Sequence, residues 1–210
     1  MLPTSRSLPR LLRPAALIAV VLALFLQGSA SAATLNVAVS NNFFFPQSAK
    51  IRPGDTIHWV WNGDNHSSTS RGSMPIRWDS AIHNSGFTYD KLFKYAGTFS
   101  YFCTVHTPSM VGTVGVQPRA TPTSGSVGTQ FTITFASTSI TGTNFQAVIQ
   151  YKVPGGTTFA PYTTATTGTS VAFDSTGQPT GDYVFQVQLK NTSTGKVSLF
   201  SPSRKITVTA

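Results

Sequence analysis

One short segment of the sequence gathers side chains that bind metal ions. Cys103, His106 and Met110 supply a thiolate, an imidazole and a thioether within eight residues, between two runs of strand-like alternation. A loop between two strands can turn all three side chains toward one point. His66, which follows the alternating run 57–61, can supply a fourth donor. Two imidazoles, one thiolate and a weak axial thioether form the ligand pattern of a blue copper electron-transfer site.

The donor types suit a metal that changes its oxidation state. Cu(I) prefers soft sulfur ligands, whereas Cu(II) prefers imidazole nitrogen, and a fixed set of both limits the rearrangement that accompanies electron transfer. Cys103 is also the single cysteine of the chain. Such a thiol can be buried and inert, can form an intermolecular disulfide or can bind a metal. The neighbouring imidazole and thioether favour metal binding.

The composition limits the elements that can position these donors. Only 10% of the residues are charged, and the chain has six aspartates and no glutamate. Long helices with charged faces are therefore excluded, and the abundant Thr, Ser, Gly, Val and Phe favour an all-β fold. Hydrophobic residues make up 40% of the chain, which is enough for a buried core and excludes wholesale disorder.

Alternation and turn residues divide the chain into two β-sandwiches. In residues 33–117 hydrophobic side chains recur at every second position, as at Ile57, Trp59 and Trp61. Residues 118–128 are rich in Pro, Gly, Ser and Thr and are predicted to form a linker. Residues 129–210 have the length and spacing of an immunoglobulin-like or fibronectin type III-like sandwich of about seven strands.

The N-terminus has the pattern of a secretory signal peptide. Arg6, Arg10 and Arg13 precede an apolar run over 15–26, and an Ala-Ser-Ala sequence predicts cleavage after Ala32. The run is too short to span a bilayer, so a protein exported to the periplasm or beyond the cell is expected, without a membrane span in the mature chain. Loss of the three arginines lowers the net charge from +9 to +6. The remaining basic residues form no run, which argues against nucleic acid and favours a mildly acidic protein partner.

Residues 34–116 also resemble the cupredoxins, specifically the plastocyanin, amicyanin and pseudoazurin type. The resemblance rests on Arg-Pro-Gly-Asp-Thr-Ile at 52–57, Asn-His at 65–66, Gly-Thr-Phe-Ser-Tyr-Phe-Cys at 97–103, and His106, Pro108, Met110 and Gly112. It implies a Greek-key β-sandwich with one type 1 copper ion. By this resemblance His66, Cys103 and His106 are the equatorial ligands, Met110 is the axial ligand, and the amide of Ser67 donates a hydrogen bond to the Cys103 sulfur.

Three functions besides that of an electron carrier fit parts of this pattern. A copper enzyme would need a second metal site, but only His58 and His83 remain after His66 and His106. A copper store would more plausibly use Met-rich or His-rich tracts, and a secreted or cell-surface interaction protein would rely on the C-terminal half. We therefore expect a monomeric, non-enzymatic electron carrier. Its redox partner is expected to dock on an apolar patch around His106.

Overall fold

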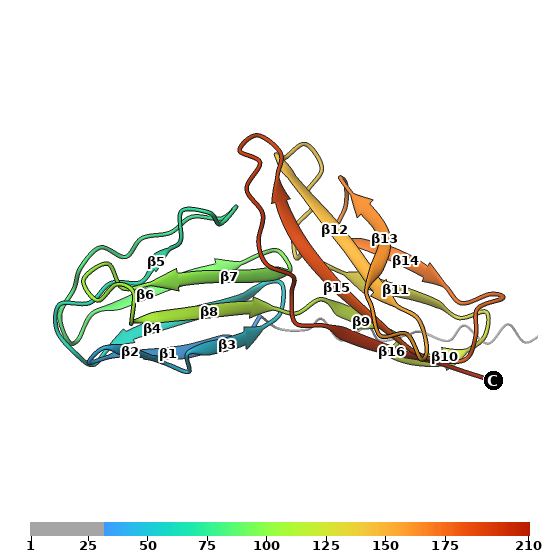
Figure 1. Ribbon diagram of the computed structural model, residues 1–210, viewed down its shortest axis with the longest axis horizontal. Coiled ribbons are helices and arrows are strands. Elements are labelled where there is room, and N and C mark those ends of the chain that lie inside the picture. Colours follow the sequence, from blue (N-terminus) through green and yellow to red (C-terminus); the bar gives the residue numbers. More distant parts are fainter. Residues whose placement is uncertain (1–31) are drawn as a thin grey trace, which may run out of the picture. The chain divides into compact units, whose positions relative to one another are not determined.

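The computed structural model describes residues 32–210, and Figure 1 labels their strands. The signal peptide is predicted over residues 1–32, and all of it except Ala32 lies outside the described residues. Within this described part, no helix is long and apolar enough to cross a membrane. The first eight strands are β1 (Thr34–Ser40), β2 (Phe43–Phe45), β3 (Ser48–Ile51), β4 (Asp55–Trp61), β5 (Thr69–Ser70), β6 (Thr88–Phe93), β7 (Gly97–Phe102) and β8 (Val111–Val116).

These eight strands form two four-stranded sheets. One sheet has the order β2-β1-β4-β6 and the other β3-β8-β7-β5. β1 runs parallel to β4, and β3 runs parallel to β8, while the remaining pairs are antiparallel. Neighbouring strands in each sheet are therefore often distant in sequence. β7 and β8, which flank the Cys103–Met110 loop, are instead consecutive in the chain and adjacent in their sheet.

Alternating side chains build the core between these sheets. In β4 every second residue is buried, and Ile57, Trp59 and Trp61 are almost fully enclosed. In β7 the same period buries Phe99 and Tyr101 and continues to Cys103. Because successive strand residues point to opposite faces, Cys103, two residues after Tyr101, points inward as Tyr101 does. The prediction of a β-sandwich is confirmed. The two-residue period of β7 places the Cys103 thiol in the interior.

The second half is also entirely β within the described residues. Its strands are β9 (Arg119–Thr121), β10 (Ser124–Ser126), β11 (Gln130–Thr134), β12 (Phe145–Lys152), β13 (Ala160–Ala165), β14 (Ser170–Asp174), β15 (Gly181–Asn191) and β16 (Arg204–Thr209). They form one sheet of order β10-β16-β15-β12-β13 and another of order β14-β11-β9. Phe131, Tyr183 and Phe185 lie at the centre of its separate hydrophobic core.

Residues 118–128 differ from the predicted linker, because they contain two strands. β9 pairs with β11, and β10 runs parallel to β16. Ala120 packs into the second core with 6% of its surface exposed. Pro122 lies in the bend that follows β9, and Gly128 lies in the turn that follows β10. The partners of these two strands lie farther along the chain, so the local composition alone resembled that of a linker.

The two halves meet through backbone and ring contacts within the compact unit 32–210. Thr98 of β7 and Leu199 exchange two backbone hydrogen bonds of 2.9 and 3.0 Å. The rings of Tyr95 and Phe145 lie 5.1 Å apart, and both residues pack against the two cores. The second half thus contacts the strand that ends beside Cys103.

Candidate metal centre

Three metal-binding atoms from two distant segments converge inside the first sandwich. The Nδ1 atoms of His66 and His106 lie 3.2 Å apart. The Sγ atom of Cys103 lies 3.5 Å from Nδ1 of His106 and 3.9 Å from Nδ1 of His66. All three donor atoms fall within 4.8 Å of one another. The structure therefore brings together three of the four residues predicted from the sequence as a group that could hold one metal ion.

The loop between β7 and β8 is closed by its own backbone. The amide of Cys103 donates to the carbonyl of Met110 at 3.0 Å, and the amide of Met110 donates to the carbonyl of His106 at 2.9 Å. These two bonds place the three residues on one tight turn between adjacent strands. The Met110 side chain is fully buried in the same hydrophobic core as Cys103.

His66 is positioned by the chain that follows β4. Asn65 adopts a positive φ of 62°, a conformation that Asn tolerates better than most residues, and turns the chain inward. The indole of Trp61 then donates to the carbonyl of His66 at 2.9 Å. His66 and His83 also exchange backbone hydrogen bonds of 3.0 and 2.8 Å. This segment is therefore anchored on both sides before any metal binds.

Ser67 connects the His66 segment to the Cys103 loop. Its amide lies 3.4 Å from the Cys103 sulfur and is directed toward it, as the resemblance implied. Its hydroxyl accepts a hydrogen bond from the amide of Thr104 at 2.9 Å and lies 3.0 Å from the Thr104 hydroxyl. Thr104 is not predicted from the sequence, because a threonine after the cysteine has no signature of its own. Its role depends on a contact between segments 37 residues apart.

Replacing Ser67 with alanine is expected to loosen the link between these segments. The change keeps the amide that faces the sulfur but leaves the amide of Thr104 without its acceptor. We expect the free energy of unfolding to fall by about 1 kcal/mol, as measured by urea denaturation. Ser109→Ala is the matched control, because its exposed hydroxyl donates only to the carbonyl of His106. Equal stability of the two variants would contradict this role for Ser67.

Burial favours an uncharged imidazole at His66. His66 is 2% exposed, and its pKa is lowered by desolvation first and by the nearby His106 second, while Asp64 acts in the opposite direction. A neutral imidazole offers a lone pair to a metal ion, whereas an imidazolium cannot. The low pKa therefore suits metal binding near neutral pH.

His106 is partly exposed and is the donor nearest to solvent. A hollow of about 360 Å³ opens beside it and His66, and its other lining residues are Asn41, Asn42, Asp64 and Asn65. The predicted apolar surface is represented here by Val105, which is 37% exposed. The edge of the centre therefore combines an exposed apolar side chain with a polar hollow.

The two other histidines take no part in this group. Nδ1 of His58 lies 2.7 Å from the carboxylate of Asp90 on the outer side of β4. The ring of His83 stacks on Phe87 at 3.4 Å, and its Nε2 lies 2.7 Å from the carbonyl of Ser80. Among residues 32–210, His66, Cys103 and His106 are the one group of this kind with converging donor atoms.

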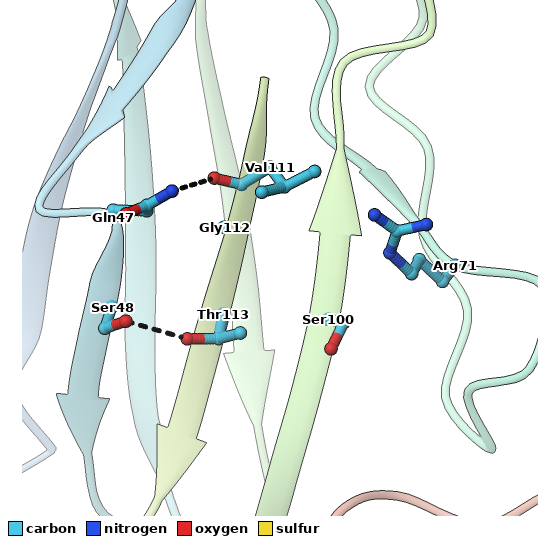
Figure 2. A pocket seen from close by; sticks show the side chains of 7 residues that line it. All are labelled: Gln47, Ser48, Arg71, Ser100, Val111, Gly112 and Thr113. Atoms are coloured by element: carbon cyan, nitrogen blue, oxygen red, sulfur yellow. Dashed lines mark hydrogen bonds between the residues drawn. The ribbon is translucent and has the colours of Figure 1, made fainter. Parts of the chain in front are cut away.

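Figure 2 shows a smaller hollow of about 170 Å³ on the outer face of the sheet β3-β8-β7. Hydroxyl groups of Ser48 and Thr113 bond to each other across β3 and β8, and Ser100 lies on β7. Arg71 is the one charged residue in its lining. Its other lining residues are Gln47, Val111 and Gly112.

The donor set fits copper on chemical grounds. One thiolate and two imidazole nitrogens match the mixed preferences of Cu(I) and Cu(II), and the amide of Ser67 meets a sulfur that would carry negative charge. These residues could bind one copper ion. The burial of Cys103 also keeps the thiol away from solvent oxidants.

Comparisons with known proteins agree with this chemistry. Residues 32–117 match the copper-binding proteins of the plastocyanin/azurin family. Similar solved structures include a purple cupredoxin from Nitrosopumilus maritimus (22% identity, 39% of this chain and 97% of that chain, TM-score 0.35). Pseudoazurin from Hyphomicrobium denitrificans is 21% identical over 40% of this chain and 74% of its own, with a TM-score of 0.36.

A copper-containing nitrite reductase from Thermus scotoductus SA-01 is 23% identical over 40% of this chain, with a TM-score of 0.37. The match spans only 22% of the reductase chain. The part of the present chain that the family match covers is the sandwich that holds His66, Cys103 and His106. Residues 32–117 of this chain are therefore similar to the plastocyanin/azurin family of copper-binding proteins.

Proposed function

We propose that this protein binds one type 1 copper ion and carries single electrons between redox proteins outside the cytoplasm. In this proposal His66, Cys103 and His106 are the equatorial ligands, and Met110 is the axial ligand. The observation that carries the proposal is the convergence of one thiol and two imidazole Nδ1 atoms within 4.8 Å. When bound, copper supplies a one-electron couple between Cu(I) and Cu(II).

The residues of this chain would hold the ligands nearly still during that exchange. Backbone bonds close the loop at Cys103 and Met110, and Ser67 joins it to the His66 segment. A site whose ligands are fixed before metal binding needs little rearrangement when one electron enters or leaves. The partly exposed imidazole of His106, beside Val105, is the proposed point of contact with a redox protein.

The proposal also extends to the organisation of the whole chain. We propose a signal peptide cleaved after Ala32, a copper domain over 33–117 and a second sandwich that begins near 118 rather than after a linker. The second sandwich has no cysteine or histidine, so we assign it no chemistry. A spacer or a surface for a protein partner is the role that remains for it.

Reversible electron exchange tests the proposed function directly. The mature protein should take up one equivalent of Cu(II), accept one electron from ascorbate, return it to ferricyanide and exchange electrons rapidly with a c-type cytochrome. A chelator should remove the copper slowly. A copper store would instead release copper to the chelator and exchange electrons slowly. Catalytic turnover of nitrite or dioxygen would contradict the assignment as a carrier.

Met110→Leu tests the axial ligand. Leucine keeps the volume of this buried side chain but removes the thioether. Loss of a donor to Cu(II) should raise the reduction potential, by at least about 59 mV if the Cu(I)/Cu(II) equilibrium shifts tenfold. Met74→Leu is the matched control, because Met74 is also buried but its sulfur faces the amide of Ser100. An unchanged potential in Met110→Leu would exclude axial ligation.

A further inference from the structure

A third hollow, of about 480 Å³, lies between the 75–77 segment and β6. Its apolar lining includes Ile76, Leu92, Tyr95 and Phe145. Leu92 is 46% exposed, and the rings of Tyr95 and Phe145 lie 5.1 Å apart. The volume falls within the range of small-molecule sites, roughly 300–1,000 Å³. Part of this apolar surface therefore faces solvent and is available to a ligand.

Three cationic side chains border the same hollow: Arg77, Lys91 and Lys94. Arg77 is held by neutral acceptors, since it donates to the hydroxyl of Ser70 at 3.2 Å and to the carbonyl of Gly72 at 3.3 Å. None of the ion pairs within residues 32–210 includes any of the three cations. Positive charge thus gathers around an apolar surface without a carboxylate from the chain itself.

The position of Lys91 disfavours its charged form. The pKa of Lys91 is lowered by burial first and by the nearby Lys94 second. Like charges that lie close together in a partly dehydrated site destabilise each other. An anion placed between them would offset the repulsion between the two ammonium groups.

We propose that this hollow is a binding site for an amphipathic organic anion, whose acidic head lies against Lys91, Lys94 and Arg77 and whose aliphatic or aromatic body covers Leu92 and Tyr95. The ligand needs both parts. A simple inorganic anion would pair with the cations but leave the apolar surface uncovered, and a neutral hydrocarbon would do the reverse. The site contains none of the proposed copper ligands, so its test is independent of the copper chemistry.

Octanoate is the probe that tests this site. Calorimetry and amide NMR of the Cu(I)-loaded protein should detect saturable binding, with signal shifts at Ile76, Leu92 and Tyr95. Two matched compounds, 1-octanol and octyltrimethylammonium, carry the same chain without the negative charge and should bind at least about tenfold more weakly. Added salt should weaken octanoate binding, because it screens the cations.

Paired variants separate a specific site from a general effect of charge. Lys91→Gln combined with Lys94→Gln should weaken octanoate binding about tenfold, since both charge-assisted contacts are lost. Lys50→Gln combined with Lys196→Gln removes the same charge from residues outside the hollow and should leave binding unchanged. Leu92→Ser, at an exposed position, should weaken binding without unfolding the protein. Three results would overturn the proposal. Octanoate could shift NMR signals only outside this hollow, 1-octanol could bind as tightly as octanoate, or the two double lysine variants could weaken octanoate binding equally.

Discussion

Replacing Cys103 with serine is expected to abolish the intense visible absorption that Cu(II) should give with this protein. The band arises from charge transfer between a thiolate and copper, and the chain has one cysteine. The sulfur lies 3.5 Å from Nδ1 of His106 and 3.9 Å from Nδ1 of His66. Because Cys103 is the single cysteine, no other thiol of the chain can replace it. Serine is close in size but stays protonated near neutral pH. Absorption and EPR spectra at one equivalent of Cu(II) measure the effect.

Two controls make this result specific. Circular dichroism of the metal-free Cys103→Ser variant should match the parent, because the buried hydroxyl can still accept from the amide of Ser67. His58→Gln should keep the full band, since His58 pairs with Asp90 outside the metal centre. A Cys103→Ser variant that kept the band, or a parent protein with ordinary square-planar Cu(II) signals, would contradict the proposed site.

Replacing Gly112 with alanine is expected to cause the second largest effect, a loss of stability of about 3 kcal/mol. Gly112 pairs with Tyr101 across β7 and β8, and the phenol ring lies over it. A methyl group at this position would lie 2.4 Å from the ring carbon Cζ. The ring cannot retreat easily, because Phe44 and Trp59 pack against it with centroids 4.6 and 5.5 Å away.

Urea denaturation of the metal-free protein measures this change. Gly72→Ala is the matched control, because the added methyl group would meet nothing closer than a guanidinium nitrogen of Arg77 at 3.8 Å. The steric strain should also reach the metal centre, since Tyr101 is two residues before Cys103 and Gly112 two residues after Met110. We therefore expect a broadened EPR signal of the Cu(II)-loaded variant. Similar stability of the Gly112 and Gly72 variants would show that the core has room for the methyl group.

The residues proposed as donors could be predicted from the sequence because most of their geometry is local. Cys103, His106 and Met110 lie on one loop between adjacent strands, and the alternation through Tyr101 predicts that the thiol points inward. His66 required only the expectation that the end of β4, a strand of the other sheet, lies at the same end of the sandwich. Periodicity and donor chemistry therefore carried most of this prediction.

Other features depend on contacts between distant segments, which strand alternation does not encode. The residues predicted to form a linker became β9 and β10, because their partners in β11 and β16 lie elsewhere in the chain. The bond between Ser67 and Thr104 likewise appears only when two loops meet.

The sequence by itself determined the strand type, the core-facing residues and the side chains that are candidate metal donors, because alternation and residue chemistry are properties of short segments. The tertiary structure alone decided which strands pair, how the Ser67 hydroxyl joins the two ligand segments, and that Lys91 and Lys94 border an apolar hollow with Phe145. These features depend on strand register and on the packing of segments far apart in the chain, and short-range patterns leave both open.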